Sequence, residues 1–310
     1  MKKTKIFITF LLLMTLFDCK SQNSIEGHII DGDTGKDILF ANVYIKDKKN
    51  GVISDQNGFF KLDIKKENYI DTLVISVLGY EIKNIAIKSF LESKSKKTIF
   101  LFENEIILPE VSIISYEINR TKIIGNYAKE QPEGRYYMRA GSHIAVHIPN
   151  TKNEKLYLKN ALFYIKNEGH PNTKFRVHVY DVCDSFGIPG NDILPVNKIV
   201  SAIKGEAWLA VDLTVYNIKI PEKGVFVAME WLPDSQEFPY EVFFSNEEKA
   251  SINHGQILGG IINRESIFGR KNESNAWYKS FLGAWYQSPV SPESRTILNP
   301  AICVEVNVVK

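Results

Sequence analysis

The fold of the first part of the chain is decided by the stretch Ala41-Asn-Val-Tyr-Ile-Lys-Asp-Lys-Lys-Asn-Gly-Val-Ile-Ser-Asp-Gln-Asn-Gly-Phe-Phe-Lys-Leu-Asp-Ile64. Short β-prone segments alternate here with turn residues. Asn50-Gly51 tolerates the positive φ of a hairpin turn, and Gln56-Asn-Gly58 is a second turn signal. In the last segment, period-two alternation sends three apolar side chains to one face: Phe60, Leu62 and Ile64. The stretch predicts two consecutive hairpins of a small antiparallel sandwich.

Similar segments flank this stretch on both sides. Ile25–Ile30 is a predicted strand before the turn Asp31–Gly35, and Leu73–Leu78 is a strand closed by Gly79-Tyr80. Together the turn and strand residues resemble the carboxypeptidase regulatory-like domain, a transthyretin-like sandwich. The resemblance is carried by Gly27, Asp31, Thr34-Gly35, Ala41-Asn42-Val43, Gly51, Asp55, Gly58-Phe59-Phe60 and Gly79-Tyr80.

The resemblance implies a fold for residues 23–114 and does not imply an activity. Such modules are non-catalytic attachments to peptidases, outer-membrane receptors and surface proteins. The segment Ile106–Ile114, with Leu-Pro-Glu-Val in it, resembles the junction that leads into the plug of a TonB-dependent receptor. Only about 190 residues follow, too few for a receptor barrel of 22 strands with roughly ten residues each. We therefore expect an envelope protein other than a receptor.

The chain begins with a secretory signal. Met1–Lys5 is basic and Ile6–Phe17 is an apolar run of twelve residues, too short to span a bilayer as a mature helix. We assign residues 1–22 to the signal peptide. Leu16 stands three before Cys19, as lipidation of Cys19 requires, but Asp18 replaces the usual small residue. Lipidation and simple cleavage near Gln22 both stay open. The expected location is the periplasm or the outer-membrane surface, with any membrane attachment made through the lipid.

The net charge of the exported protein indicates which classes of partner it is suited to bind. Loss of Met1–Cys19 removes three lysines and Asp18, so 38 basic and 36 acidic residues become 35 and 35. Formal neutrality argues against a nucleic-acid partner, which would require a basic face. We expect a glycan or another envelope protein as partner. The exported cysteines are Cys183 and Cys303, and the sequence leaves open whether they form a disulfide or stay two buried thiols.

The rest of the chain predicts a second, larger β-domain. The polar run 115–133, broken by Gly125 and Pro132, is the predicted linker, and residues 134–310 form the domain. Its strands are predicted at 141–148, 156–165, 173–182, 207–213, 215–220, 224–231, 242–244, 256–262 and 301–309. Nine strands with turn-rich joints indicate a jelly-roll-like antiparallel sandwich, so the fold class is all-β. The one candidate helix, at 192–202, is restricted by Pro195 to its first turn.

The sequence contains no Gly-x-Ser-x-Gly, no His-Glu-x-x-His and no phosphate-binding glycine loop, and none of its six histidines is followed by Glu three residues later. His143 and His147 lie four residues apart in a predicted strand, which separates them by roughly 13 Å, too far for one metal ion. Asp181, Asp184 and Asn191 offer oxygen ligands for Ca²⁺, but Asx turns explain them equally. We predict no cofactor and no metal.

Polar and aromatic side chains alternate with apolar ones on three predicted strands. If these strands are neighbours in one sheet, the second face resembles a sugar-binding platform, with rings for the sugar faces and charges for the hydroxyls. The candidate ligand-binding residues are Arg176, His178, Tyr180, Trp208, Asp212 and Glu230. The alternatives are a solvated outer sheet or a seat for the first domain. Ala276-Trp-Tyr278 recurs as Ala284-Trp-Tyr286, and we expect these rings to cover the core.

The sequence thus predicts a non-catalytic, exported envelope protein that acts as a binding or structural module, with glycans as candidate ligands. The alternative is a carbohydrate-active hydrolase that uses two carboxylates from Asp181, Asp212 and Glu230. Such an enzyme needs its carboxylates roughly 5 to 9.5 Å apart across a cleft. The placement of these three side chains decides between the two.

Overall fold

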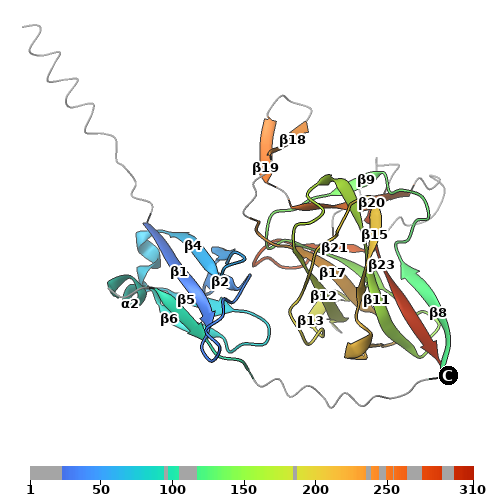
Figure 1. Cartoon of the computed structure of the whole chain (residues 1–310), viewed down its shortest axis with the longest axis horizontal. Helices are drawn as coiled ribbons and strands as arrows, with labels where there is room; N and C mark the ends of the chain where they lie inside the picture. The colour runs from blue at the N-terminus through green and yellow to red at the C-terminus, as the bar shows by residue number, and fades with distance from the viewer. Residues whose placement is uncertain are drawn as a thin grey trace, which may run out of the picture.

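The computed structural model describes residues 23–93, 97–104, 117–183, 187–234, 239–243, 249–253, 255–263, 274–287 and 297–310. Strands dominate these ranges and the fold is all-β, as predicted. In Figure 1 the first domain, in blue and teal, lies beside the larger second domain, in green to red. Among the described residues, no helix has the length and apolar character needed to cross a membrane. Cys19 and the signal lie outside these ranges.

The first domain is a two-sheet sandwich. One sheet has the order β4 (Phe59–Ile64), β1 (Asn23–Asp31), β7 (Thr98–Leu101). The other has the order β3 (Gly51–Ile53), β2 (Asn42–Ile45), β5 (Thr72–Ser76), β6 (Lys83–Ala86). A 3-10 turn η1 (Lys66–Ile70) and a short helix α2 (Ile87–Glu92) complete it. Apolar side chains from both sheets pack between them, including Ile25, Val43, Leu62 and Ile75.

One predicted hairpin is present and the other is wrong. β2 and β3 pair antiparallel across Asn50-Gly51. β3 and β4, however, belong to different sheets, so the chain crosses the sandwich at 54–58. Asp55 drives this crossing because one carboxylate oxygen accepts from the backbone N–H of Asn57 at 2.8 Å and of Phe59 at 2.9 Å. The predicted alternation in β4 is correct: Phe60, Leu62 and Ile64 are buried.

Asp31 and Tyr80, two residues of the pattern that carries the resemblance, link two turns that lie 49 residues apart in the sequence. Asp31 accepts backbone N–H groups of Asp33 at 2.9 Å and Thr34 at 2.8 Å. Its second oxygen accepts from the hydroxyl of Tyr80 at 2.9 Å. The aspartate therefore fixes its own turn and ties it to the Gly79-Tyr80 closing turn.

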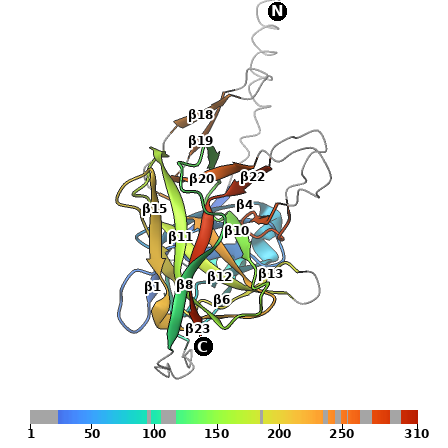
Figure 2. The same cartoon turned by 90° about the vertical axis from the view of Figure 1, so that its right-hand side faces the viewer.

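The second domain is a larger sandwich. Its six-stranded sheet has the order β13 (Pro189–Asp192), β12 (Phe175–Val182), β17 (Val225–Trp231), β10 (His143–Ile148), β21 (Ala276–Lys279), with β14 (Lys198–Val200) also paired to β12. Figure 2 shows this sheet behind the second layer.

The second layer is an eight-stranded sheet in the order β22 (Ile297–Pro300), β20 (Gln256–Asn263), β11 (Leu156–Gly169), β23 (Ile302–Val309), β8 (Ile118–Gly125). Three more strands join it: β15 (Ala207–Asp212), β16 (Lys219–Ile220) and β9 (Gly134–Tyr136). The strands β18 (Pro239–Phe243) and β19 (Lys249–Asn253) pair separately. The core between the layers is apolar and includes Phe163, Phe175, Val177, Val227 and Trp231.

Several boundaries differ from the prediction. The predicted linker 115–133 contains β8, which pairs with the C-terminal strand β23. β8 was missed because it is an edge strand whose side chains are mostly exposed, so it lacks an apolar alternation. The candidate helix at 192–202 is wrong, since β13 and β14 occupy its ends. The predicted strand 215–220 is a 3-10 turn, η2 (Thr214–Tyr216), followed by the two-residue β16.

The two cysteines do not form a disulfide. Cys303 is buried on β23, while Cys183 follows β12 in the other sheet, and both are free thiols. Burial raises the pKa of the Cys303 thiol to about 12, so it stays protonated and unreactive.

Candidate functional site

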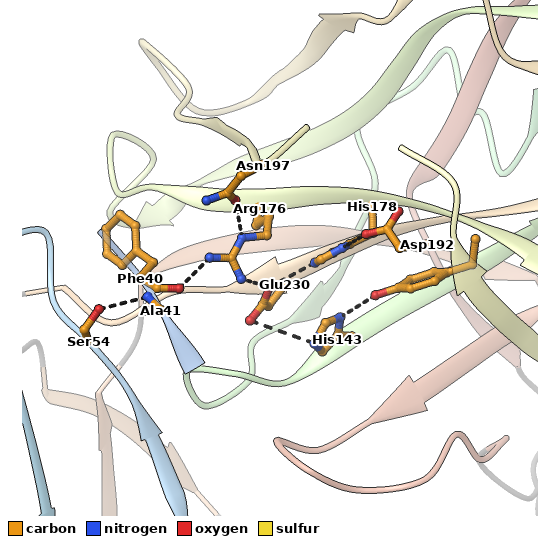
Figure 3. A network of polar contacts seen from close by, with 10 residues as sticks. Phe40, Ala41, Ser54, His143, Arg176, His178, Asp192, Asn197 and Glu230 are labelled. Carbon is orange, nitrogen blue, oxygen red and sulfur yellow. Dashed lines mark hydrogen bonds and ion pairs between the residues drawn. The ribbon is translucent and has the colours of Figure 1, made fainter. Parts of the chain in front are cut away.

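Strand register brings four of the predicted site residues together. β10, β17 and β12 are neighbours, and His143, Glu230 and Arg176 stand directly opposite one another across them. His178 and Tyr180 follow Arg176 at period two on β12, so they share its face. This face points away from the core between the sheets. Figure 3 shows the side chains meeting around Glu230.

Glu230 is the centre of the group. Its side chain is 2% exposed, and one carboxylate oxygen accepts from Arg176 Nη1 at 2.7 Å and from His178 Nε2 at 2.9 Å. The other oxygen lies 3.9 Å from His143 Nε2. Burial alone would raise the pKa of Glu230, but the adjacent Arg176 and His178 outweigh it and hold the pKa well below its usual value. Its two cationic neighbours therefore favour the ionised form of Glu230.

Arg176 connects Glu230 to the first domain. Its Nε donates to Asn197 Oδ1 at 2.6 Å, and its Nη2 donates to the backbone carbonyl of Phe40 at 2.6 Å. Phe40 is 1% exposed and has a left-handed φ of 55°. The ammonium of Lys174 lies 5.8 Å from the centre of the Phe40 ring. The guanidinium thus uses its planar set of donors to join two elements of the second domain and one loop of the first.

His178 lies between two carboxylates. Its Nδ1 is 2.6 Å from Asp192 Oδ2, and its Nε2 faces Glu230. Burial would lower the pKa of His178, but the hydrogen bonds to Asp192 and Glu230 outweigh burial and raise the pKa. An imidazolium donates from both nitrogens, which satisfies both carboxylates at once. His178 is therefore the second cation of the group.

His143 is neutral by contrast. Burial lowers its pKa to about 3, and its Nδ1 lies 3.2 Å from the hydroxyl of Tyr180. Burial also raises the pKa of Tyr180 well above its usual value, so its hydroxyl stays protonated. The pair closes the group on the side of β10 with a neutral hydrogen bond.

Aromatic rings cover this face. The Trp285 ring packs edge-on against Tyr180 at 5.3 Å and against His143 at 5.8 Å, and the Trp277 ring packs edge-on against Phe226 at 6.3 Å. These rings belong to the repeated Ala-Trp-Tyr segments, whose Tyr278 and Tyr286 pair through their backbones. The expectation that the repeat covers a core agrees with this placement. The candidate ligand face is consequently a polar network in which Arg176, His178, Tyr180, Glu230 and His143 are buried and Asp192 is partly exposed.

The network does not fit a metal ion. Ligand atoms of His143, His178 and Glu230 lie within 4.8 Å of one another. However, one oxygen of the Glu230 carboxylate already accepts hydrogen bonds from Arg176 and His178. A divalent cation would have to displace these hydrogen bonds beside a buried guanidinium, which is unfavourable.

Two predicted site residues lie elsewhere. Trp208 and Asp212 are on β15, which pairs with β11 in the eight-stranded sheet, so the three strands are not neighbours as assumed. The Trp208 ring stacks on Tyr127 at 5.3 Å, and its Nε1 donates to the carbonyl of Ala128 at 3.3 Å. Asp212 caps the following turn by accepting the backbone N–H of Thr214 at 2.8 Å. The six residues do not form one ligand platform.

The carboxylates of the hydrolase alternative are also separated, because Asp212 is in the eight-stranded sheet and Asp181 lies at the opposite end of β12 from Arg176, the residue that faces Glu230. Glu230 is held ionised in a buried ion pair, and the pKa of Asp212 is lowered by its bonds to Thr214, whereas a general acid needs a raised pKa. Asp181 accepts the backbone N–H of Asn191 at 2.7 Å and its side-chain amide at 3.3 Å, so this carboxylate joins β12 to β13 and does not form the Asx turn considered from the sequence. Asp184, the third oxygen ligand considered for Ca²⁺, lies outside the described residues.

The sequence analysis missed two members of the network, Asp192 and His143. His143 was weighed only with His147, its neighbour in the same strand. Its true partners are Glu230 and His178 on other strands, and only strand order and register reveal them.

Comparisons with known proteins identify the first domain. Residues 25–113 match the family model of the CarboxypepD_reg-like domain. The chain is also 25% identical over 139 residues to the TonB-dependent receptor SusC of Bacteroides thetaiotaomicron. That alignment covers 43% of this chain and 13% of the receptor, so the chain spans a small part of this relative's length. As its turn and strand residues predicted, this chain carries a CarboxypepD_reg-like domain at residues 25–113.

Proposed function

We propose that this protein is an exported, non-catalytic component of the bacterial envelope that binds a glycan or another envelope protein. The CarboxypepD_reg-like domain and the similarity to a TonB-dependent receptor support an envelope role. The basic and apolar start of the sequence supports export. Attachment to the membrane through Cys19 would place the protein at the periplasmic or outer surface.

The buried polar network is the observation that carries this proposal. Its charged side chains form hydrogen bonds with one another, and Arg176 also donates a hydrogen bond to the Phe40 carbonyl of the first domain. A catalytic acid or base needs access to substrate and a pKa near the working pH, while Glu230 has neither. The second domain thus serves as a support that fixes the first domain in one position.

The test is to incubate the mature protein with a panel of oligosaccharides and measure retention and turnover together. We expect binding of at least one glycan with no change in its mass by mass spectrometry after long incubation. Release of a shorter product would contradict the non-catalytic assignment. Co-purification with one envelope protein in place of a glycan would select the other partner class.

A further inference from the structure

The outer face of the sheet β4-β1-β7 carries a hollow of about 780 Å³. It opens over the centre of the first domain's smaller sheet, away from its core. The side chains that define it are Glu26, His28, Asp55, Phe59, Lys61 and Lys97. None of these belongs to the buried network of the second domain.

An exposed aromatic ring forms one wall of the hollow. Phe59 is 51% exposed, and the core does not need it because Phe60 and Leu62 fill the inner face of β4. The Phe59 ring stacks on His28 with centroids 4.1 Å apart and planes 11° apart. His28 Nε2 in turn lies 2.8 Å from Asp37 Oδ1. Phe59 is thus held in one orientation before any ligand arrives, which lowers the entropic cost of binding.

The rim carries both signs of charge. Glu26 and Lys61 stand opposite each other on β1 and β4 and form an ion pair of 2.7 Å, each more than half exposed. Asp55 and Lys97 add one further charge of each sign. The hollow is therefore formally neutral, so it has no net attraction for an anionic or a cationic ligand. Exposed carboxylates and ammonium groups suit a ligand with many hydroxyls, which both donate and accept.

A peptide strand fits this hollow less well. A strand would add to a sheet through free backbone groups at an edge. The hollow lies over β1, which is the central strand and is paired on both sides, with β4 and with β7. The surface available to a ligand is the face of the sheet, where rings and charged side chains project.

We propose that this hollow binds a neutral oligosaccharide, with a sugar ring packed on Phe59 and its hydroxyls bonded to Glu26 and Lys61. The proposal rests on the proposed binding function and gives it a site and a ligand class. The packing of a sugar C–H face on an aromatic ring supplies the apolar contact, and the paired charges orient the sugar.

The test is to titrate the full mature protein with gluco-, manno-, galacto- and xylo-hexaoses and to measure binding by two-dimensional NMR or calorimetry. A uronic acid hexamer and a chitosan hexamer serve as acidic and basic counterparts. We expect at least one neutral hexaose to bind and to shift the amide signals of β1 and β4. Phe59→Ala should weaken that binding by about ten-fold or more, and Phe59→Trp should retain it.

Ile70→Ala is the matched control, because Ile70 is also an exposed apolar residue of the first domain, at 92% exposure, and lies outside the hollow. It should bind as the wild type does. Unchanged binding by Phe59→Ala, binding of charged hexamers only, or no binding of any neutral hexaose would each overturn this site. If Phe59→Ala binds as the wild type does, this site is wrong but the proposed binding function is unaffected. Turnover of the hexaose would contradict the proposed non-catalytic function and leave the site unaffected.

Discussion

Glu230 shows how one residue determines whether a polar face is a site or a support. Its carboxylate compensates the positive charges of Arg176 and His178 while it is almost fully removed from solvent. Such a group is expensive to bury but more expensive to remove, since its partners would then stay buried without compensation. Removal of Glu230 is therefore expected to destabilise the network more than its burial does.

Glu230→Gln should therefore destabilise the protein strongly. We expect a loss of about 3 to 5 kcal/mol in the free energy of unfolding, measured by urea denaturation. Glu168→Gln is the control, because Glu168 pairs with Arg135 at 2.6 Å on the surface and should cost no more than about 1 kcal/mol. Similar losses in the two variants would contradict the buried network.

His178 predicts a pH dependence with a definite sign. Because its pKa is raised in the folded protein, its contribution to stability is complete below the unfolded value of about 6.5 and is lost as pH rises through the folded value. The difference in unfolding free energy between wild type and His178→Gln should be largest near pH 5 and shrink toward pH 9. His147→Gln, outside the network, is the control.

The contribution of His143 to stability has the opposite pH dependence. Burial lowers its pKa in the folded protein to about 3, so its contribution is complete above about pH 6.5 and is lost as pH falls below that value. Comparing each variant with wild type at the same pH cancels most of this effect. A difference for His178→Gln that grows with rising pH would show that His178 is not the buried cation described here.

Side-chain alternation predicted part of this network from the sequence. It placed Arg176, His178 and Tyr180 on one face of their strand, and Glu230 on the corresponding face of another. It failed for Trp208 because the period of a strand does not reveal which sheet the strand joins. It did not predict that Trp277 and Trp285 cover this face, since each ring lies far along the sequence from the residue it packs on, Phe226 and Tyr180 respectively. Of the alternatives considered, the contact of Arg176 with the Phe40 carbonyl agrees with a seat for the first domain.

At the scale of elements, the errors fall where strands lack an apolar alternation. β8 is mostly exposed and was taken for a linker, and β13 and β14 are short edge pieces of a sheet. The long buried strands β10, β11, β12, β17 and β23 were predicted close to their true positions. Buried strands are thus the elements that the sequence predicts best, because their apolar alternation is visible, and exposed edge strands are the ones that it predicts worst.

β8 ends at a glycine that tests its assignment as a strand of the sheet. Gly125 has a φ of 111°, and a Cβ there would lie 2.9 Å from the Cα of Cys303 on β23. Gly125→Ala should cost about 2 kcal/mol or more in unfolding free energy, from backbone strain and overpacking.

Gly187→Ala is the matched control for this change. Gly187 also has a positive φ, of 64°, but no atom of the described residues lies within 4 Å of the Cβ position, so only backbone strain should appear. Equal unfolding free energies for Gly125→Ala and Gly187→Ala would contradict the close packing of β8 on β23.

At the scale of the whole molecule, two sandwiches meet through specific contacts. Arg176 donates to the Phe40 carbonyl, and the Phe281 ring lies so close to Gly51 that an added Cβ would be 2.8 Å from it. Figure 3 shows the first contact, with Ser54 bonding the adjacent Ala41 N–H at 2.8 Å. The loop of the first domain is thereby held from both sides.

The proposed anchor gives a prediction for the location of the whole molecule. If Cys19 is acylated, the native protein should sediment with membranes and Cys19→Ala should appear in the soluble fraction, because the lipidated cysteine supplies the acyl chains for stable attachment. Cys183→Ala, a change at a free thiol in the folded part, should remain with the membranes. Mass spectrometry that finds a mature N-terminus beyond Cys19 would exclude the anchor.

The central claim is that the polar network of the second domain holds the first domain, and hydrogen–deuterium exchange of Arg176→Lys tests it most directly. Lysine keeps a positive charge beside Glu230 but lacks the donors that reach the Phe40 carbonyl. Peptides covering Ile38–Tyr44 should exchange several-fold faster in this variant, while Arg135→Lys leaves them unchanged. Identical exchange of these peptides in wild type and a folded Arg176→Lys variant would contradict the claim.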